Sequence, residues 1–333
     1  MSDTDLRAPA ETAVEQCANL GGDESCVVVS DDKRCPIGEA LYEAASAVTD
    51  DATLLQYPPG DQHGEEPPAP VAAAMRDADV FFAPTTKSLS HTRARGDACD
   101  AGARGATLPG ITEEVFLTGL DADYERIRAE CDAMLETVAD ADEVRITTDL
   151  GTDFTVYPGD REWRDDHGLI HDPGSFSNLP AGEVFVSPET AEGTYVVDGT
   201  MMPHGLLDDG ETLTFEVEDG VVTSISDDEI REQVETAAEA VGDAAEGTSA
   251  SSDAPRRNAA YNLAELGIGT NVAVTELVGS VLLDEKAGST VHVALGDDAG
   301  IGGDTDAPIH LDGIIRDPTV YADGEEVALP EGV

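Results

Sequence analysis

Positive charge is scarce in this sequence. Its 333 residues include 18 lysines and arginines against 70 aspartates and glutamates, which gives a net charge of −52. Lysine occurs only at Lys33, Lys87 and Lys286. Such a chain repels phosphates, so we expect no nucleic-acid partner. The acids are spread along the whole chain and do not form one patch for a cationic partner. We therefore favour the interpretation that they keep a hydrated surface, which stays soluble in high salt. This is typical of a salt-accumulating halophile.

The sequence also lacks long apolar runs and several common motifs. No stretch of about 18 apolar residues occurs, so we expect neither a membrane-spanning helix nor a membrane partner. The N-terminal segment has neither the basic start nor the apolar core of a secretory signal, and we expect a cytoplasmic protein. The five cysteines form no CxxC pair, which favours reduced thiols. No phosphate-binding loop, GxSxG elbow or HExxH motif occurs.

The first 140 residues alternate between apolar strands and helices. Buried strands are expected at 26–31, 53–57, 80–84 and 106–110, with helices between them. Strands separated by helices are joined by parallel crossovers. Residues 1–140 are therefore predicted to form an α/β domain around an open, mostly parallel sheet.

The second part of the chain changes to short alternating strands. Two β-hairpins are predicted where Asp-Gly pairs separate apolar strands, at residues 219–220 and 323–324. Ser226 and Glu229 have the spacing of a capping box, which predicts the start of a helix. Residues 141–333 are predicted to form one α+β domain, and this domain carries the candidate metal-binding and catalytic residues.

Residues 284–313 carry the strongest sign of chemistry. Two short apolar strands, joined by a loop of Gly, Asp and Thr, bear His292 on the first and His310 with Asp312 on the second. Residues two apart on a strand point the same way, so His310 and Asp312 can offer a nitrogen and a carboxylate to one point. Neutral imidazole with carboxylate suits a divalent transition metal. A surface hydrogen bond between His310 and Asp312 explains their spacing equally well.

Two glutamates lie in apolar surroundings. Glu183 follows a Pro-Ala-Gly turn at the start of an apolar strand, and Glu265 stands just before a Gly-rich turn. Most glutamates of so acidic a chain are solvated charges, but the neighbours of these two are not acidic. With the two histidines and Asp312, they make three carboxylates and two imidazoles. This set suits two divalent ions that activate a water and polarise a carbonyl.

The other histidines give weaker signals. His91 lies beside Arg93 and Arg95 in a basic cluster, which either binds a carboxylate or, as we favour, pairs with local acids. His167 and His171 flank a glycine and precede a proline, so we expect a surface loop there.

A family resemblance rests on five segments that occur in a fixed order. They are GTDFTVYPGDREW (151–163), NLPAGEVFVSP (178–188), NLAELGIGTN (262–271), LLDEKAGSTVHVALG (282–296) and IHLDG (309–313). They resemble the aminopeptidase T family of metallopeptidases. SLSHTRARGDACDAGARGATLPGIT (88–112) also resembles archaeal members of that family.

The resemblance implies a ligand set, an activity and an assembly. The residues that match the family's metal ligands are Glu183, Glu265, His292, His310 and Asp312. The family holds two divalent ions, commonly zinc or cobalt, and manganese, magnesium or iron are compatible with the same donors. It removes N-terminal residues from peptides, usually as a homodimer. Glu183 or Glu265 would handle the proton while an activated water attacks the scissile carbonyl. We therefore predict a metal-dependent aminopeptidase.

Two alternatives stay open. Well-studied members of that family carry a tyrosine seven residues after the first ligand histidine, where this sequence has Ala299. A related branch of the same fold holds one iron through histidines and an aspartate, and opens dihydroxypyridine rings oxidatively. The other alternative is a metal-binding protein without peptidase activity, because one scaffold can host different chemistry.

Overall fold

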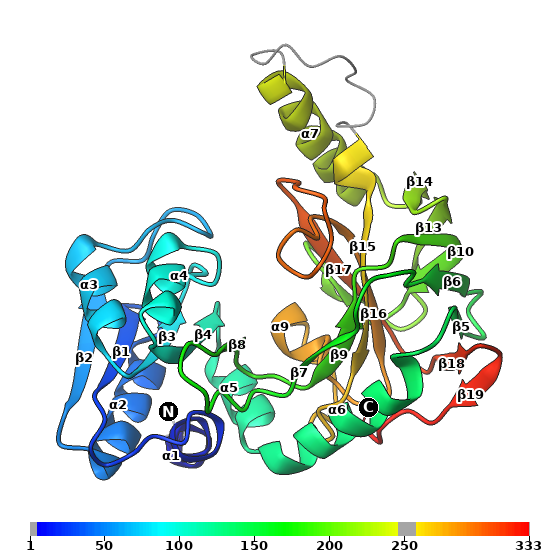
Figure 1. Ribbon diagram of the computed structural model, residues 1–333. Coiled ribbons are helices and arrows are strands. Elements are labelled where there is room, and N and C mark those ends of the chain that lie inside the picture. Colours follow the sequence, from blue (N-terminus) through cyan, green and yellow to red (C-terminus); the bar gives the residue numbers. More distant parts are fainter. Residues whose placement is uncertain (1–4, 246–257, 333) are drawn as a thin grey trace. The chain divides into compact units, whose positions relative to one another are not determined.

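The computed structural model describes residues 5–245 and 258–332 and divides into two compact units (Figure 1). Unit 1 comprises Met1–Arg128 and Asp166–Ala181, and unit 2 comprises Ala129–Asp165 and Gly182–Val333. The chain therefore leaves unit 1, begins unit 2, returns to add a strand to unit 1, and then completes unit 2. Among the described residues, no helix is both long enough and apolar enough to cross a membrane.

Unit 1 is built on a five-stranded parallel sheet with the order β2-β1-β3-β4-β8. The strands are β1 (Cys26–Asp31), β2 (Ala52–Tyr57), β3 (Val80–Thr85), β4 (Arg104–Pro109) and β8 (Phe176–Asn178). All residues of β1 and β3 are buried, as expected for inner strands of a parallel sheet covered by helices. The prediction of an open parallel sheet in the N-terminal part of the chain is confirmed.

Two helical segments precede β1, and the other helices of unit 1 follow β1, β2, β3 and β4. They are α1 (Arg7–Glu11), the π-helical turn η1 (Thr12–Cys17), α2 (Cys35–Val48), α3 (Ala69–Asp77), α4 (Arg93–Asp100) and α5 (Glu113–Leu120). Threonine begins two of them: the hydroxyl of Thr92 accepts a hydrogen bond from the Arg95 amide, and that of Thr112 accepts one from the Val115 amide. Each threonine thus satisfies an amide that has no partner within its own helix. The sequence of α6 (Tyr124–Val138) crosses from unit 1 into unit 2.

Unit 2 contains two seven-stranded sheets. The first has the order β14-β13-β10-β6-β5-β18-β19 and is antiparallel. Its strands are β5 (Val144–Thr147), β6 (Asp153–Tyr157), β10 (Thr190–Val197), β13 (Leu213–Glu218), β14 (Val221–Ile225), β18 (Thr319–Ala322) and β19 (Glu325–Val327). Its core includes Tyr195, which stacks on Phe215 at 4.6 Å between ring centroids and meets Phe154 edge-on at 5.4 Å.

The second sheet has the order β12-β11-β17-β16-β15-β9-β7. Its strands are β7 (Arg164–Asp166), β9 (Glu183–Val186), β11 (Thr200–Met201), β12 (Gly205–Leu206), β15 (Leu263–Gly269), β16 (Val291–Gly296) and β17 (His310–Ile315). In the described part of unit 2, the other helical segments are α7 (Asp228–Ala245), the 3-10 turn η2 (Asn258–Tyr261) and α9 (Val281–Asp284). The two sheets approach closely, since a Cβ on Gly313 of β17 would lie 2.4 Å from Cγ2 of Val197 on β10.

Both predicted hairpins are present. Asp219 and Gly220 have φ angles of 51° and 75° between β13 and β14. Asp323 and Gly324 have φ angles of 49° and 81° between β18 and β19. Two successive residues with positive φ match the twist of the flanking strands, and Asp-Gly adopts this conformation readily.

The predicted capping box at Ser226 and Glu229 is wrong. The helix α7 begins at Asp228, and the carboxylate of Asp227 accepts the hydrogen bond from the Ile230 amide at 2.9 Å. The hydroxyl of Ser226 instead accepts a hydrogen bond from the amide of Thr214 in β13 at 2.8 Å. Ser226 is therefore hydrogen-bonded to the sheet, and Asp227 caps the helix.

Candidate metal centre

Four neighbouring strands of the second sheet carry all five residues that the sequence suggested as metal ligands. Glu183 begins β9, Glu265 lies in β15, His292 lies in β16, and His310 and Asp312 lie in β17. The structure thus brings together residues that are up to 129 positions apart in the chain.

The register of the strands places these side chains on one face of the sheet. Directly paired residues of antiparallel strands point to the same side, and so do residues two apart on one strand. The pairs that connect the site are Glu183 with Gly269, Glu265 with Ala294, Ala294 with Asp312, Gly267 with His292, and Gly296 with His310. Polar residues thus alternate with glycine and alanine across this face, which leaves room above the sheet.

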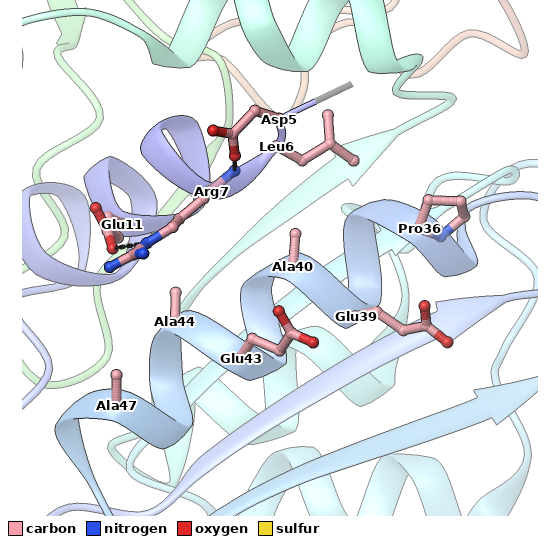
Figure 2. A pocket seen from close by; sticks show the side chains of 10 residues that line it. All are labelled: Asp5, Leu6, Arg7, Glu11, Pro36, Glu39, Ala40, Glu43, Ala44 and Ala47. Carbon is pink, nitrogen blue, oxygen red and sulfur yellow. Dashed lines mark hydrogen bonds and ion pairs between the residues drawn. The ribbon is translucent and has the colours of Figure 1, made fainter. Parts of the chain in front are cut away.

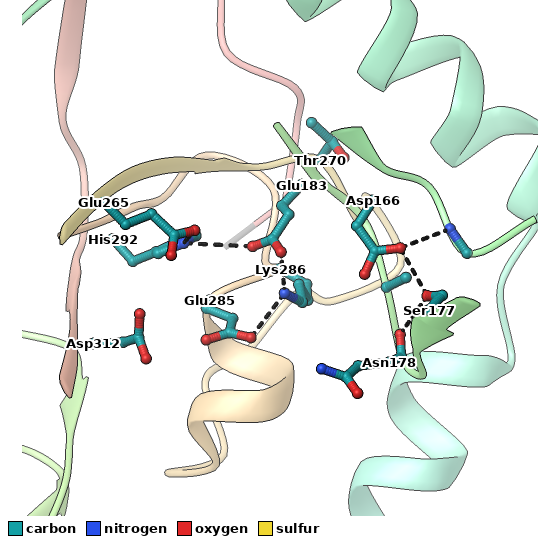
Figure 3. Close-up of polar contacts among 12 residues, drawn as sticks. Asp166, Ser177, Asn178, Glu183, Glu265, Thr270, Glu285, Lys286, His292 and Asp312 are labelled. Carbon is teal, nitrogen blue, oxygen red and sulfur yellow. Dashed lines mark hydrogen bonds and ion pairs between the residues drawn. The ribbon is translucent and has the colours of Figure 1, made fainter. Parts of the chain in front are cut away.

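Glu265 lies between the two imidazoles. Its Oε1 is 3.3 Å from Nε2 of His292, and its Oε2 is 3.5 Å from Nε2 of His310. Nε2 of His310 is also 3.3 Å from Oδ1 of Asp312, and Nε2 of His292 is 3.4 Å from Oε2 of Glu183. Figure 3 shows the buried end of this arrangement, with Glu265, His292 and Glu183 drawn close to one another.

The centre is buried at one end and accessible at the other. Glu183 and Glu265 are each 6% exposed, and His292 is 1% exposed. The side chain of His310, in contrast, is 33% exposed. Solvent therefore reaches the centre at the end that holds His310.

Gly267 makes room for the ring of His292. The two residues are paired across β15 and β16. A Cβ on Gly267 would lie 2.0 Å from Cε1 and 2.1 Å from Nε2 of His292, far inside any normal contact. The imidazole therefore lies over the backbone of the neighbouring strand, where no side chain fits.

The loop between β16 and β17 fixes the orientation of His310. Its Nδ1 lies 2.7 Å from the carbonyl oxygen of Asp297, so Nδ1 carries the proton and Nε2 is directed at the carboxylates. The next residue, Asp298, is 4% exposed and anchors the loop. Its carboxylate accepts hydrogen bonds from Ser187 (3.0 Å), Asn262 (2.9 Å) and the Thr305 amide (2.6 Å).

The donors fit a divalent metal ion. Two overlapping groups have ligand atoms within 4.8 Å of one another: Glu183 with Glu265 and His292, and Glu265 with His310 and Asp312. Oε2 of Glu183 and Nδ1 of His292 are buried and have no hydrogen-bond partner among the described residues. Buried polar atoms are rarely left without a partner, so the unsatisfied carboxylate oxygen of Glu183 beside the imidazole of His292 points to a positive charge nearby.

Comparison with known families gives the context for this centre. The profile of the NicX family, described as 2,5-dihydroxypyridine 5,6-dioxygenase, matches residues 9–332. The chain belongs to the NicX family. A search of curated proteins finds no match.

Two solved structures share the fold of this NicX-family chain. A 2,5-dihydroxypyridine dioxygenase from Pseudomonas putida KT2440 has a TM-score of 0.77 and 19% identity, and the match covers 100% of this chain and 98% of that one. Wild-type AmpT from Thermus thermophilus has a TM-score of 0.64 and 18% identity, with coverage of 97% and 99%. At these identities the likeness shows the fold alone. The expected aminopeptidase T membership is therefore supported only at the level of the fold.

The electrostatics of the NicX-family centre couple its acids to its histidines. Burial acts to raise the pKa of Glu265, but hydrogen bonds from His292 and His310 outweigh it and hold that pKa below its usual value. Burial acts to lower the pKa of His292, but Glu265 and Glu183 outweigh it and raise the pKa to about 9. The pKa of Asp312 is lowered, against burial, by the neighbouring His310. A divalent ion would therefore compete with protons on the imidazoles.

Two residues at the buried end were missed by the sequence reasoning. Lys286 is 4% exposed, and its Nζ contacts Oε1 of Glu183 and lies 2.8 Å from Oε1 of Glu285 (Figure 3). Burial raises the pKa of Glu183 to about 8, although Lys286 works in the opposite direction. The sequence did offer one signal for Lys286. The chain contains only three lysines, so a lysine between two segments that carry metal-site residues is unusual.

The basic cluster in unit 1 serves local structure. The guanidinium of Arg93 pairs with Glu66 at 3.3 Å, as expected for pairing with a local acid. Arg95 instead donates to the carbonyl oxygen of Ser90 at 2.7 Å and lies 4.5 Å above the ring of Phe176. Both arginines therefore already have partners within unit 1, and we assign neither of them to a carboxylate ligand.

A hollow of about 480 Å³ lies in unit 1 between α1 and α2 (Figure 2). Alanines of α2 line one side, and Glu39 and Glu43 project from the same helix. Glu11 on the opposite side is paired with Arg7 at 2.6 Å. Histidine is not among the described residues that line this hollow, and exposed carboxylates alone do not define a metal site. We assign it no function.

Proposed function

We propose that this protein is a metal-dependent ring-cleaving dioxygenase that acts on a dihydroxylated nitrogen heteroaromatic ring. The supporting observation is a partly open centre where Glu265, His310 and Asp312 bring ligand atoms within 4.8 Å of one another and His292 lies 3.3 Å from Glu265, in a chain that matches the NicX family over residues 9–332. Two histidines and one carboxylate with open coordination positions are the ligand set of non-haem iron(II) oxygenases.

The residues divide into those that would hold the ion and those that orient them. His292, His310 and Asp312 would hold iron(II), which when bound supplies a site for both dioxygen and a ring hydroxyl. Glu265 keeps both imidazoles directed toward the same point, and the Asp297 carbonyl fixes the proton of His310 on Nδ1. The burial of Glu183 and His292 keeps bulk water from the closed end of the site.

Oxygen uptake tests this proposal. The apo protein in molar KCl is loaded anaerobically with iron(II) and mixed with 2,5-dihydroxypyridine and dioxygen. We expect ring absorbance to disappear with equimolar uptake of dioxygen, because a dioxygenase places both oxygen atoms in its product. His310→Ala should show neither. A loaded wild-type protein that consumes no dioxygen with any dihydroxypyridine isomer would refute the proposal.

A metal-dependent aminopeptidase is the second candidate. The group formed by Glu183, Glu265 and His292 favours it, because it offers carboxylates for a second ion beside the first. Hydrolysis of Leu-p-nitroanilide by zinc- or cobalt-loaded protein, without any need for dioxygen, would select this activity. The expected homodimer is a prediction that size-exclusion chromatography in molar salt can check.

A further inference from the structure

Lys286 is buried in an acidic centre. It lies two residues after the end of α9, and its side chain is 5% exposed. The backbone of Lys286 is held on both sides, since its amide donates to the carbonyl of Leu283 and its carbonyl accepts from the amide of Asn271. Burying an ammonium group is costly unless it is paired, so its two carboxylate partners explain why it can stay there.

Gly269 allows the lysine segment to approach the sheet. A Cβ at Gly269 would lie 2.0 Å from the carbonyl oxygen of Ala287 and 2.9 Å from the carbonyl carbon of Lys286. Gly269 is also the residue paired with Glu183 across β15 and β9. The same glycine thus brings the backbone of Lys286 beside the strand pair from which Glu183 projects.

The ammonium group occupies one side of the Glu183 carboxylate. Oε1 of Glu183 contacts Nζ of Lys286, while Oε2 lies 3.4 Å from Nε2 of His292. A metal ion bound by Glu183 would sit close to this fixed positive charge and would be repelled by it. The donors at the open end are Glu265, His310 and Asp312, a group that shares Glu265 but not Glu183 with the buried group.

We propose that Lys286 takes the place of a second metal ion at the Glu183 end of the centre. The protein then binds one divalent ion per chain, held by His292, His310 and Asp312 as proposed above, with Glu265 beside it. Glu183 is a hydrogen-bonding group and not a ligand, and Lys286 is a positioning residue that acts through it. This inference rests on the proposed metal centre, and it states how many ions that centre takes and why.

Cobalt(II) titration of the apo protein, without substrate, tests the inference. Isothermal calorimetry counts the ions, and the visible and electron paramagnetic resonance spectra report whether one ion or a coupled pair is present. We expect the wild type to bind one equivalent. Lys286→Met keeps the length of the side chain but removes its charge, and should bind a second equivalent at least about tenfold more tightly than the wild type does. Lys33→Met, which changes an exposed lysine of unit 1, is the matched control and should bind one equivalent.

Glu183→Gln provides a test that needs no change of the lysine. If Glu183 is not a ligand, this variant should still bind one equivalent with nearly unchanged affinity. Two tight equivalents in the wild type, the loss of an equivalent in Glu183→Gln, or a single equivalent in folded Lys286→Met would each overturn the inference. One bound ion without ring cleavage would refute the proposed function and leave the role of Lys286 intact. Ring cleavage with two bound ions would support the proposed function and refute the role of Lys286.

Discussion

Gly267→Ala is the smallest change that tests how the sheet holds His292. The added Cβ would lie 2.0 Å from Cε1 of the imidazole. This is roughly 1.5 Å less than a normal contact of about 3.5 Å between carbons. Gly267 does not have a left-handed φ angle, so alanine introduces no backbone strain and the clash alone is tested. Because His292 is 1% exposed, its ring has no free space to enter.

The expected magnitudes follow from this geometry. Overpacking of a well-packed interior costs about 1–3 kcal/mol, so the free energy of unfolding of the apo protein should fall by that amount. A ligand displaced by an ångström or more loses its alignment with the ion, and we expect the affinity for cobalt(II) to fall by about 100-fold. Urea unfolding and calorimetric titration in molar KCl measure the two effects separately.

Gly96→Ala is the matched control for this prediction. Gly96 lies in α4 with no atom within 4 Å of its added Cβ, so alanine should stabilise the helix by roughly 0.5–1 kcal/mol and leave metal binding unchanged. If Gly267→Ala binds cobalt(II) as tightly as the wild type and is equally stable, the ring of His292 does not lie over β15. The register from which the centre is derived would then be wrong.

Three further predictions concern the centre and unit 1. A divalent ion at about 100 times its dissociation constant should stabilise the wild type by about 2.7 kcal/mol in thermal melts, and His310→Ala should abolish that gain. Asp298→Asn should weaken metal binding by about tenfold, because it loosens the loop that orients His310. Asp306→Asn, which changes an exposed residue of the same loop, should leave the affinity unchanged. Equal metal affinities of the two variants would contradict the anchoring role of Asp298. Glu24→Gln should cost about 2 kcal/mol at pH 7, because it leaves the guanidinium of Arg104, 8% exposed, without its partner. Arg104 lowers the pKa of Glu24, so this contribution is fully present above the pKa of the unfolded chain and is lost as the pH falls through the lowered pKa of the folded protein. The difference between Glu24→Gln and the wild type should vanish over that range, and a constant difference would argue against it.

Much of the candidate centre could be inferred from local patterns. His310 and Asp312 are two residues apart, which predicts that their side chains share one face of a strand. The structure contains this strand as β17. The settings of Glu183 and Glu265 among apolar residues correctly indicated burial. The hairpins at 219–220 and 323–324 were also predictable, because the conformation of an Asp-Gly turn depends on two residues alone.

Other features depended on partners that lie far away in the chain. Residues 176–178 add β8 to the parallel sheet of unit 1, although residues 129–165, earlier in the chain, belong to unit 2. Ser226 has the spacing of a helix cap, but the amide of Thr214 competes successfully for its hydroxyl. Lys286 had no local pattern that marks a buried lysine, since its burial depends on Glu183, more than a hundred residues earlier.

The order of residues along the chain is enough to set which side chains are available for chemistry, their direction on each strand, and the acidic character of the whole chain. These properties follow from composition and from the two-residue period of a strand, which need no distant contact. Tertiary structure decided that β9, β15, β16 and β17 lie side by side, that Gly267 meets His292, and that Lys286 faces Glu183. Strand order and register arise from hydrogen bonds and packing between distant segments, and only these place two imidazoles, four carboxylates and one ammonium group in a single centre.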